Sequence, residues 1–154
     1  MAPSPHVLIV EARFYEDIAD QLVKGASQVL DRAGVSYDRI SVPGVFEVPG
    51  AIRFALRGTE ARPSRRVYSG FVALGCVIKG ETDHYDHICR EASRAIMDIS
   101  MLHCAAVGFG ILTCPNFELA WVRAAVDQKN KGADAAGACL RMMELRQQFG
   151  LVSP

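Results

Sequence analysis

A histidine stands just inside the start of an expected helix, directly after a glycine-bracketed turn. Val67 to Leu74 is a short apolar run rich in β-branched and aromatic residues, which is typical of a buried strand. The turn from Gly75 to Gly80 follows, and Thr82 and Asp83 are both competent helix N-caps. His84 then lies in the first helical turn, beside unpaired backbone amides that favour anions. Proton transfer near neutral pH is the chemistry that a histidine adds there.

Other interpretations of this segment are open. Any strand-to-helix connection needs glycines and a cap, so the same residues also suit a plain crossover with a solvated histidine. His84, His87, Cys76 and Cys89 are zinc-ligand types, but their number and spacing match no recognised zinc site, so we expect no metal. A nucleophile pair of Cys76 with His84 is also open, although no third group that would orient it is apparent.

Three more residues could take part in binding. Phe14 follows the first expected strand and could stack on a flat heterocycle, although a lone aromatic is more often part of the core. Glu47 lies between Phe46 and Val48, so its carboxylate needs a partner, such as ligand hydroxyls, a lysine or a helix end. Arg123 falls on an expected helix, where its guanidinium suits a phosphate or simply faces solvent.

These residues must be positioned by strands that alternate with helices. Apolar runs predict buried strands over residues 6–10 and 67–74, alternation predicts a strand over 35–42, and a fourth strand is expected over 105–112. Helical periodicity and stop signals predict helices over residues 18–33, 50–56, 84–102, 117–129 and 133–149. This alternation favours a three-layer α/β fold with a four-stranded parallel sheet, which we expect in the order 2-1-3-4. Ligands bind outside the carboxyl ends of such strands, an edge expected to carry residues 13–14, 44–47, 75–84 and 113–116.

Composition narrows the class of protein. A chain of 154 residues that is half hydrophobic can bury a real core, so we expect one globular domain over residues 1–154. Lys plus Arg and Asp plus Glu both number 17, so no overall field draws the chain to nucleic acid or to a membrane. Five cysteines without a C-x-x-C pair fit a reducing compartment. No leader pattern and no membrane-length apolar run are apparent, so we expect a soluble cytoplasmic protein.

Five motifs in this order and spacing closely resemble the lumazine synthase family of riboflavin biosynthesis. They are A-R-F at 12–14, V-P-G-V-F-E-V-P at 42–49, L-G-C-V-I-K-G-E-T-D-H-Y-D at 74–86, F-G-I-L-T at 109–113 and N-K-G at 130–132. The resemblance implies a flavodoxin-like αβα fold and a transferase that needs no cofactor. Its expected reaction condenses 5-amino-6-(D-ribitylamino)uracil with 3,4-dihydroxy-2-butanone 4-phosphate, and the product is 6,7-dimethyl-8-ribityllumazine.

The resemblance also implies a role for each matching residue, with His84 as the proton-transfer residue. The pyrimidine substrate would be held by Phe14, Val45, Phe46, Glu47, Cys76, Val77 and Ile78. The butanone phosphate would be met by Glu81 and Thr82 at the helix start and gripped by Arg123, with Lys131 as an addition. Phe109 would close the pocket from a neighbouring subunit. Tyr15 departs from the asparagine that is usual after R-F.

An oligomer is a further expectation from the resemblance. The family forms pentamers with active sites between adjacent subunits, and in some members twelve pentamers close into a shell. We therefore expect a homopentamer. The alternative function is a flavin-binding or carrier protein on the same fold, because a pocket for this ring system is suited to flavins as well.

Overall fold

The computed structural model describes residues 4–62 and 66–151. Four parallel strands form one sheet in the order β2-β1-β3-β4, which confirms the expected topology. Their bounds are β1 (His6–Ala12), β2 (Ser36–Val42), β3 (Gly70–Ile78) and β4 (Val107–Cys114). Val7 of β1 pairs with Tyr37 on one side and with Gly70 on the other, so the carboxyl ends of the strands lie at one edge of the sheet.

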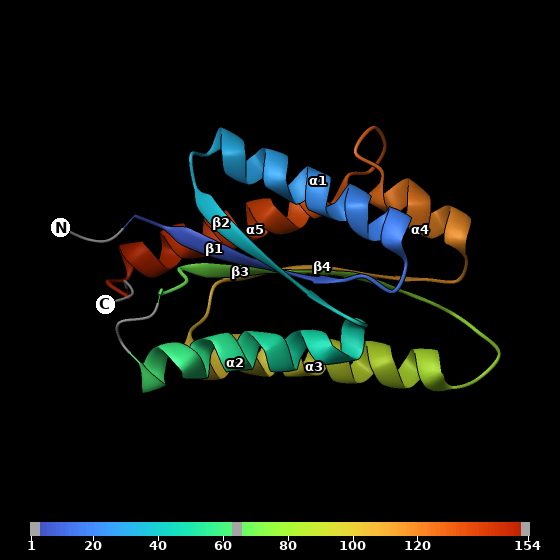
Figure 1. The fold of residues 1–154 in the computed structure, drawn as a ribbon, viewed down its shortest axis with the longest axis horizontal. Helices are drawn as coiled ribbons and strands as arrows, with labels where there is room; N and C mark the ends of the chain where they lie inside the picture. Colours follow the sequence, from blue (N-terminus) through green and yellow to red (C-terminus); the bar gives the residue numbers. More distant parts are fainter. Residues whose placement is uncertain (1–3, 63–65, 152–154) are drawn as a thin grey trace.

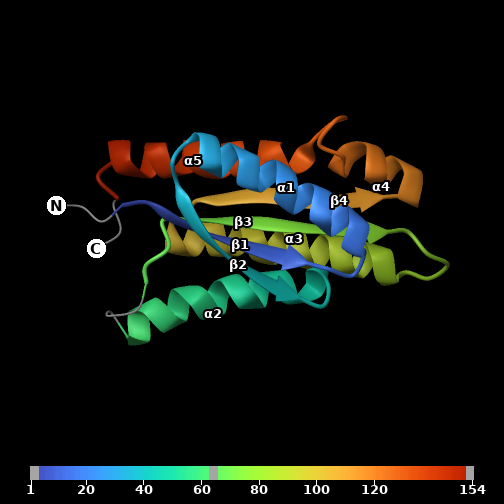
Figure 2. The same ribbon diagram turned by 45° about the horizontal axis from the view of Figure 1, so that its top comes forward.

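Helices cover both faces of the sheet, which gives the three layers seen in Figures 1 and 2. One face carries α1 (Glu16–Arg32), α4 (Phe117–Ala124) and α5 (Lys131–Gln148). The other carries the 3-10 turn η1 (Val45–Glu47), α2 (Val48–Ala61) and α3 (His84–His103). Alternate side chains of β1 enter the two apolar clusters, with Val7 on one face and Leu8 on the other. This two-sided burial explains why β1 and β3 are nearly continuous apolar runs, whereas the edge strand β2 is largely exposed.

The ends of several helices follow from local sequence. Gly34 ends the turn after α1 with a φ of 69°, a conformation that glycine adopts at little cost. Pro49 lies in the first turn of α2, where its missing N–H costs no helical hydrogen bond. The Asn116 side chain caps α4, because its Oδ1 accepts a hydrogen bond of 2.9 Å from the Leu119 backbone nitrogen.

The expected end of the third strand is wrong. The strand runs on to Ile78, so Gly75 lies inside β3 instead of opening a loop. A Cβ atom at Gly75 would come within 2.8 Å of a Val45 methyl carbon and 3.0 Å of the Ala12 side chain. Glycine is therefore present for close packing of neighbouring segments and not for a turn.

Other boundaries also differ from the expectations. The first strand extends to Ala12, and the helix expected over 50–56 runs from Val48 to Ala61. Gly58–Ala61 of the expected irregular stretch 58–66 are thus helical, and residues 63–65 lie outside the described chain. The helix expected to reach residue 129 ends at Ala124, because Ala125 has an extended backbone with a ψ of 129°. Within the described ranges, none of the helices is both long and apolar enough to cross a membrane.

Candidate functional site

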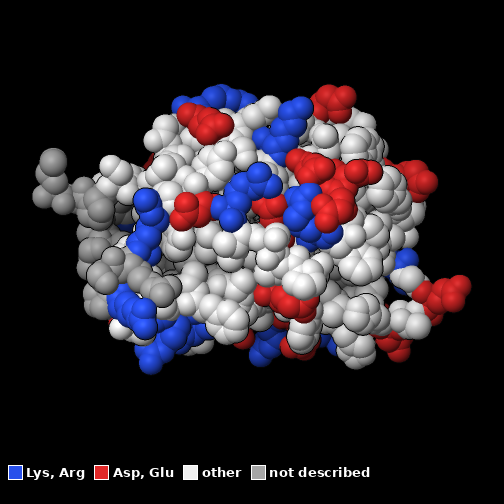
Figure 3. Space-filling view, viewed as in Figure 1, with Lys and Arg blue, Asp and Glu red and all other residues white. Residues whose placement is uncertain are grey.

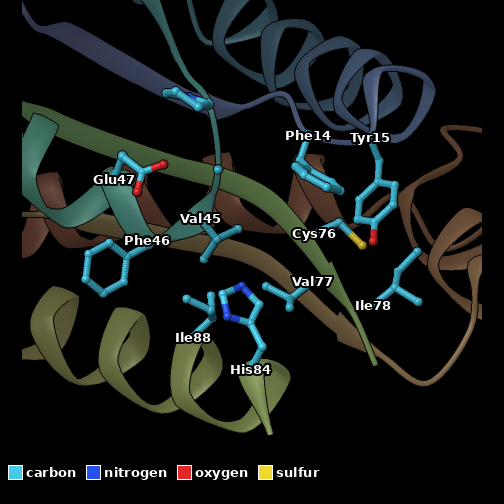
Figure 4. A pocket seen from close by; sticks show the side chains of 12 residues that line it. Phe14, Tyr15, Val45, Phe46, Glu47, Cys76, Val77, Ile78, His84 and Ile88 are labelled. Carbon is cyan, nitrogen blue, oxygen red and sulfur yellow. The ribbon is translucent and has the colours of Figure 1, made fainter. Parts of the chain in front are cut away.

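A cavity of about 590 Å³ opens at the carboxyl ends of β1, β2 and β3. This is the edge at which ligands of parallel α/β sheets bind. The cavity brings together these expected site residues: Phe14, Val45, Phe46, Glu47, Cys76, Val77, Ile78 and His84. Figure 4 shows Phe14 and His84 entering it from opposite sides, one from the turn after β1 and the other from the start of α3.

Two aromatic rings form the wall that follows β1. Phe14 is 70% exposed, so the core interpretation of this residue is wrong. Its ring contacts Tyr15 edge to face, with the centroids 4.9 Å apart and the planes at 73°. Partial burial raises the pKa of the Tyr15 phenol, so the group stays protonated and can donate a hydrogen bond at neutral pH. This wall offers a flat apolar surface beside a polar hydroxyl.

The wall after β2 is the 3-10 turn η1. Val45 is buried and anchors the turn, while Phe46 and Glu47 are exposed at the rim of the cavity. The Glu47 carboxylate is therefore not the enclosed group that its apolar neighbours predicted. An exposed carboxylate beside an aromatic ring can accept hydrogen bonds from the hydroxyls of a ligand that enters the cavity.

The end of β3 forms the floor. Cys76 is buried there, and Val77 and Ile78 are partly buried. Burial raises the pKa of the Cys76 thiol to about 12, with smaller contributions from Cys114 and Cys89. A thiol that stays protonated at neutral pH is a poor nucleophile. This argues against the pair of Cys76 with His84 and leaves Cys76 as an apolar surface.

His84 is the first residue of α3 and lies exposed at the opening of the cavity. Its backbone nitrogen donates a hydrogen bond of 3.3 Å to Thr82 Oγ1, while the N-cap residue Asp83 makes no side-chain capping bond. Neither Glu81 nor Thr82 lines the cavity, although both lie in the exposed turn just before His84. The first turn of α3 therefore presents one imidazole to the cavity, next to helix amides that favour anions.

The remaining expected site residues lie outside this cavity. Arg123 on α4 donates from Nη1 to the Leu119 carbonyl oxygen at 3.4 Å. Burial raises the pKa of Cys114 at the end of β4, and the charge of Arg123 opposes that rise, which places the guanidinium near this strand end. Phe109 is exposed on the edge strand β4, and Lys131 Nζ pairs with Asp134 Oδ2 at 3.0 Å. A single chain therefore brings together in this cavity only part of the expected site residues.

Sequence reasoning missed three residues of the lining: Tyr15, Pro43 and Ile88. Ile88 lies four residues after His84, on the same helical face, and this spacing could have assigned it to the cavity. Tyr15 could have been found because it follows Phe14 directly at a strand end. Among residues 4–62 and 66–151, no group of three His, Cys, Asp or Glu side chains is arranged to hold a metal ion.

Known proteins resemble this chain over almost its whole length. The family model for 6,7-dimethyl-8-ribityllumazine synthase matches residues 4–147. The chain belongs to this family. The 6,7-dimethyl-8-ribityllumazine synthase of Bartonella tribocorum (strain CIP 105476 / IBS 506) is 51% identical over 150 residues, covering 97% of this chain and 95% of the relative. That of Agrobacterium fabrum (strain C58 / ATCC 33970) is 50% identical over 146 residues, covering 95% and 97%.

A third relative has the same name with a number. The 6,7-dimethyl-8-ribityllumazine synthase 1 of Rhizobium meliloti (strain 1021) is 50% identical over 145 residues, covering 94% of each chain. The resemblance seen in the five motifs is thereby confirmed, and so is the expectation of a transferase of riboflavin biosynthesis. The alternative of a flavin carrier gains no support from these relatives.

Proposed function

We propose that the cavity is the site at which this chain condenses 5-amino-6-(D-ribitylamino)uracil with 3,4-dihydroxy-2-butanone 4-phosphate. The products are 6,7-dimethyl-8-ribityllumazine, phosphate and water. The observation that carries the assignment is the placement of Phe14 and His84 on opposite sides of one cavity, with Glu47 at its rim. A ring-stacking residue, a carboxylate for hydroxyls and a proton carrier are the groups that this reaction needs.

The pyrimidine substrate takes the apolar half of the cavity in this proposal. Its flat ring stacks on Phe14, because aromatic faces bind planar heterocycles. Its ribityl hydroxyls reach the rim, where Glu47 accepts hydrogen bonds and Val45 and Phe46 contact the chain. Cys76, Val77 and Ile78 of β3 close the pocket beneath the ring.

The proton transfers are assigned to His84. The reaction forms an imine, eliminates phosphate and closes a second ring with loss of water, so protons must move repeatedly near neutral pH. Histidine is suited to this, because its unperturbed pKa of about 6.5 lies close to the working pH. Holding both substrates in one cavity supplies the rest of the acceleration, since it turns an encounter in solution into a reaction between aligned neighbours.

The butanone phosphate is assigned to the start of α3 and to Arg123. Glu81 and Thr82 lie in the turn where free helix amides favour a phosphate, and an arginine stabilises the negative charge that develops as phosphate leaves. Lys131 is proposed as a secondary contact. In a single chain Arg123 lies outside the cavity, so this part of the site depends on how the chain assembles.

We propose a homopentamer whose sites are completed between adjacent subunits. Each subunit forms a single domain, and the protein acts in the cytoplasm. Phe109 is exposed on the edge strand β4 and would close the cavity of a neighbour. Met97, Met101 and Leu102 of α3 are also exposed, and an apolar surface of this kind marks a protein interface. Analytical ultracentrifugation tests this proposal, and a monomer at micromolar concentration would contradict it.

The function is tested by mixing the purified protein with both substrates and following lumazine formation by absorbance. Enzyme-dependent product above the spontaneous reaction supports the synthase. No acceleration from a folded protein, with riboflavin still bound, would overturn the proposal in favour of a flavin-binding protein.

A further inference from the structure

A buried carboxylate pairs with two arginines next to the turn that carries Phe14. Glu11 of β1 is only 3% exposed. Arg39 of β2 donates to both of its oxygens, from Nε to Oε2 and from Nη2 to Oε1, each at 2.8 Å. Arg13 donates from Nη1 to Oε1 at 2.8 Å. A buried charge is tolerated only when it is paired in this way, so Glu11 holds both guanidinium groups in place.

Arg13 extends this network to the first helix. Its Nε donates to Glu16 Oε2 at 2.8 Å, and its Nη2 pairs with Glu16 and with Asp20. These partners raise the pKa of Arg13, with Asp20 contributing most. Figure 3 shows acidic and basic side chains lying beside one another near the centre of the view, in the region that α1 and β2 occupy in Figure 1. One guanidinium therefore ties the end of β1 to the first two turns of α1.

The backbone of Arg13 makes a second connection, to the end of β2. Its nitrogen donates a hydrogen bond of 3.1 Å to the Val42 carbonyl oxygen. Phe14 follows Arg13 directly, and the segment 43–47 follows Val42, so each partner of this bond leads into a different wall of the cavity. Arg13 thus joins both walls through its main chain and fixes the turn between β1 and α1 through its side chain.

The Phe14 ring itself is held by little packing. It is 70% exposed, and its aromatic contact is with Tyr15, the next residue of the same turn. An exposed side chain is positioned mainly by the backbone that carries it. We propose that Arg13 is a positioning residue for ligand binding, which fixes the turn 13–15 so that the Phe14 ring faces a planar ligand. The inference rests on the proposed function, because Phe14 must be the ring that stacks.

A double-mutant cycle between Arg13 and Phe14 tests the inference. The probe is 6,7-dimethyl-8-ribityllumazine, and its dissociation constant is measured by fluorescence titration of the full-length protein. Arg13→Gln should raise that constant about fivefold, within the range expected from loss of one aromatic stack. In the Phe14→Ala background the same change should alter it less than about twofold, because the ring through which Arg13 acts is gone.

A structural role without positioning predicts a different result. In that case Arg13→Gln would lower the fraction of folded protein, measured by circular dichroism, and leave the dissociation constant of the folded protein unchanged. Arg39→Gln is the matched control, since it removes a guanidinium from the same carboxylate without touching the turn, and it should change lumazine binding less than about twofold. Equal weakening by Arg39→Gln and Arg13→Gln would overturn the inference, as would additive effects in the cycle.

A second variant tests the inference if the Arg13→Gln protein does not fold. Glu16→Ala combined with Asp20→Ala removes two exposed partners of Arg13 and leaves the buried pair with Glu11 intact. This variant should weaken lumazine binding in the same direction and raise the KM for the pyrimidine but not for the butanone phosphate. Unchanged binding would count against positioning. A wild-type protein that neither binds lumazine nor forms it would instead refute the proposed function.

Discussion

Gly132 packs against the backbone of Leu22 so closely that a Cβ atom on the glycine would overlap the leucine carbonyl group. The contact joins the first turn of α5 to the middle of α1. Asn130, just before α5, fills the equivalent space beside Gly25. The N-K-G motif at 130–132 is therefore explained by close approach of two helices, which only a residue without a side chain permits.

Gly132→Ala should destabilise the protein, because the added methyl group has no space and the two helices must separate. Overpacking of this kind costs about 1–3 kcal/mol, measured as the free energy of unfolding in urea. Gly137→Ala is the control on the same helix, since a Cβ there meets no atom within 4 Å. It should stabilise the protein by up to about 1 kcal/mol through helix propensity. Equal stability of the two variants would contradict the packing argument.

Tyr68→Phe should lower stability at pH 7 and have little effect at pH 2.5. The Tyr68 hydroxyl donates to Asp38 Oδ2 at 2.8 Å, and His6 Nε2 lies 3.1 Å from the same oxygen. These contacts, that of Tyr68 foremost, lower the pKa of Asp38. A depressed pKa in the folded state stabilises the fold above the unfolded value of about 3.9, and this gain is lost as pH falls through the folded pKa.

The expected effect of Tyr68→Phe is small, because half of the Asp38 side chain is exposed and solvent screens the interaction. We expect a loss of less than about 1 kcal/mol at pH 7. Urea unfolding at the two pH values measures it, and contributions from other carboxylates cancel when the variant is compared with wild type at each pH. The same loss at pH 2.5 as at pH 7 would show that the carboxylate is not the partner that matters.

The cysteines should differ sharply in reactivity. Burial raises the pKa of both Cys76 and Cys139 to about 12, whereas Cys104 is exposed at the end of α3. Because the thiolate is the reactive form, iodoacetamide at pH 8 should modify Cys104 well before Cys76 and Cys139. Peptide mass spectrometry follows each site, and urea should make all of them reactive. Rapid alkylation of Cys76 in the native protein would mean that the floor of the cavity is more open than described.

His84→Ala should slow turnover by about a hundredfold while product binding stays close to wild type, because loss of a proton carrier affects the chemical steps. Single-turnover absorbance measures the rate, and fluorescence titration measures binding. His87→Ala is the control, since His87 lies on the same helix but does not line the cavity. A comparable loss of binding in His84→Ala would contradict the proton-transfer role.

Arg123→Ala should raise the KM for the butanone phosphate about tenfold or more, because a charge-assisted contact to phosphate contributes about 1.5–3 kcal/mol. Binding of the pyrimidine should change little. Steady-state kinetics with each substrate varied in turn separates the two effects, and Arg141→Ala on the outer face of α5 serves as a charge-matched control. Equal damage to both substrates would refute the phosphate assignment.

The topology was predictable from the sequence because β1 and β3 form apolar runs, β2 alternates and each helix shows its own periodicity. The end of β3 was not, since Gly75 reads as a turn residue when its neighbours in space are unknown. Its contacts with Val45 and Ala12 come from distant segments. The end of α4 at Ala124 was missed for a similar reason, because alanine at 125 is an excellent helix former and no stop signal precedes it.

The site could be predicted in part, because strand order places Phe14, Glu47 and His84 at one edge of the sheet. That Phe14 is exposed could not be read from its type, since an aromatic after a buried strand suits the core equally well. The network of Glu11 with Arg13 and Arg39 could not be predicted from the sequence either. It requires the pairing of β1 with β2, which brings residues 28 positions apart into contact.

Two phenyl rings at the cavity are left largely in water, with Phe14 70% and Phe46 62% exposed. A planar ligand that covers both rings removes this apolar surface from water, and burial of apolar surface lowers the heat capacity. Binding enthalpy measured by calorimetry should therefore become more negative as the temperature rises. The slope of that dependence is the heat-capacity change of binding, and it measures how much apolar surface of the two rings the ligand buries.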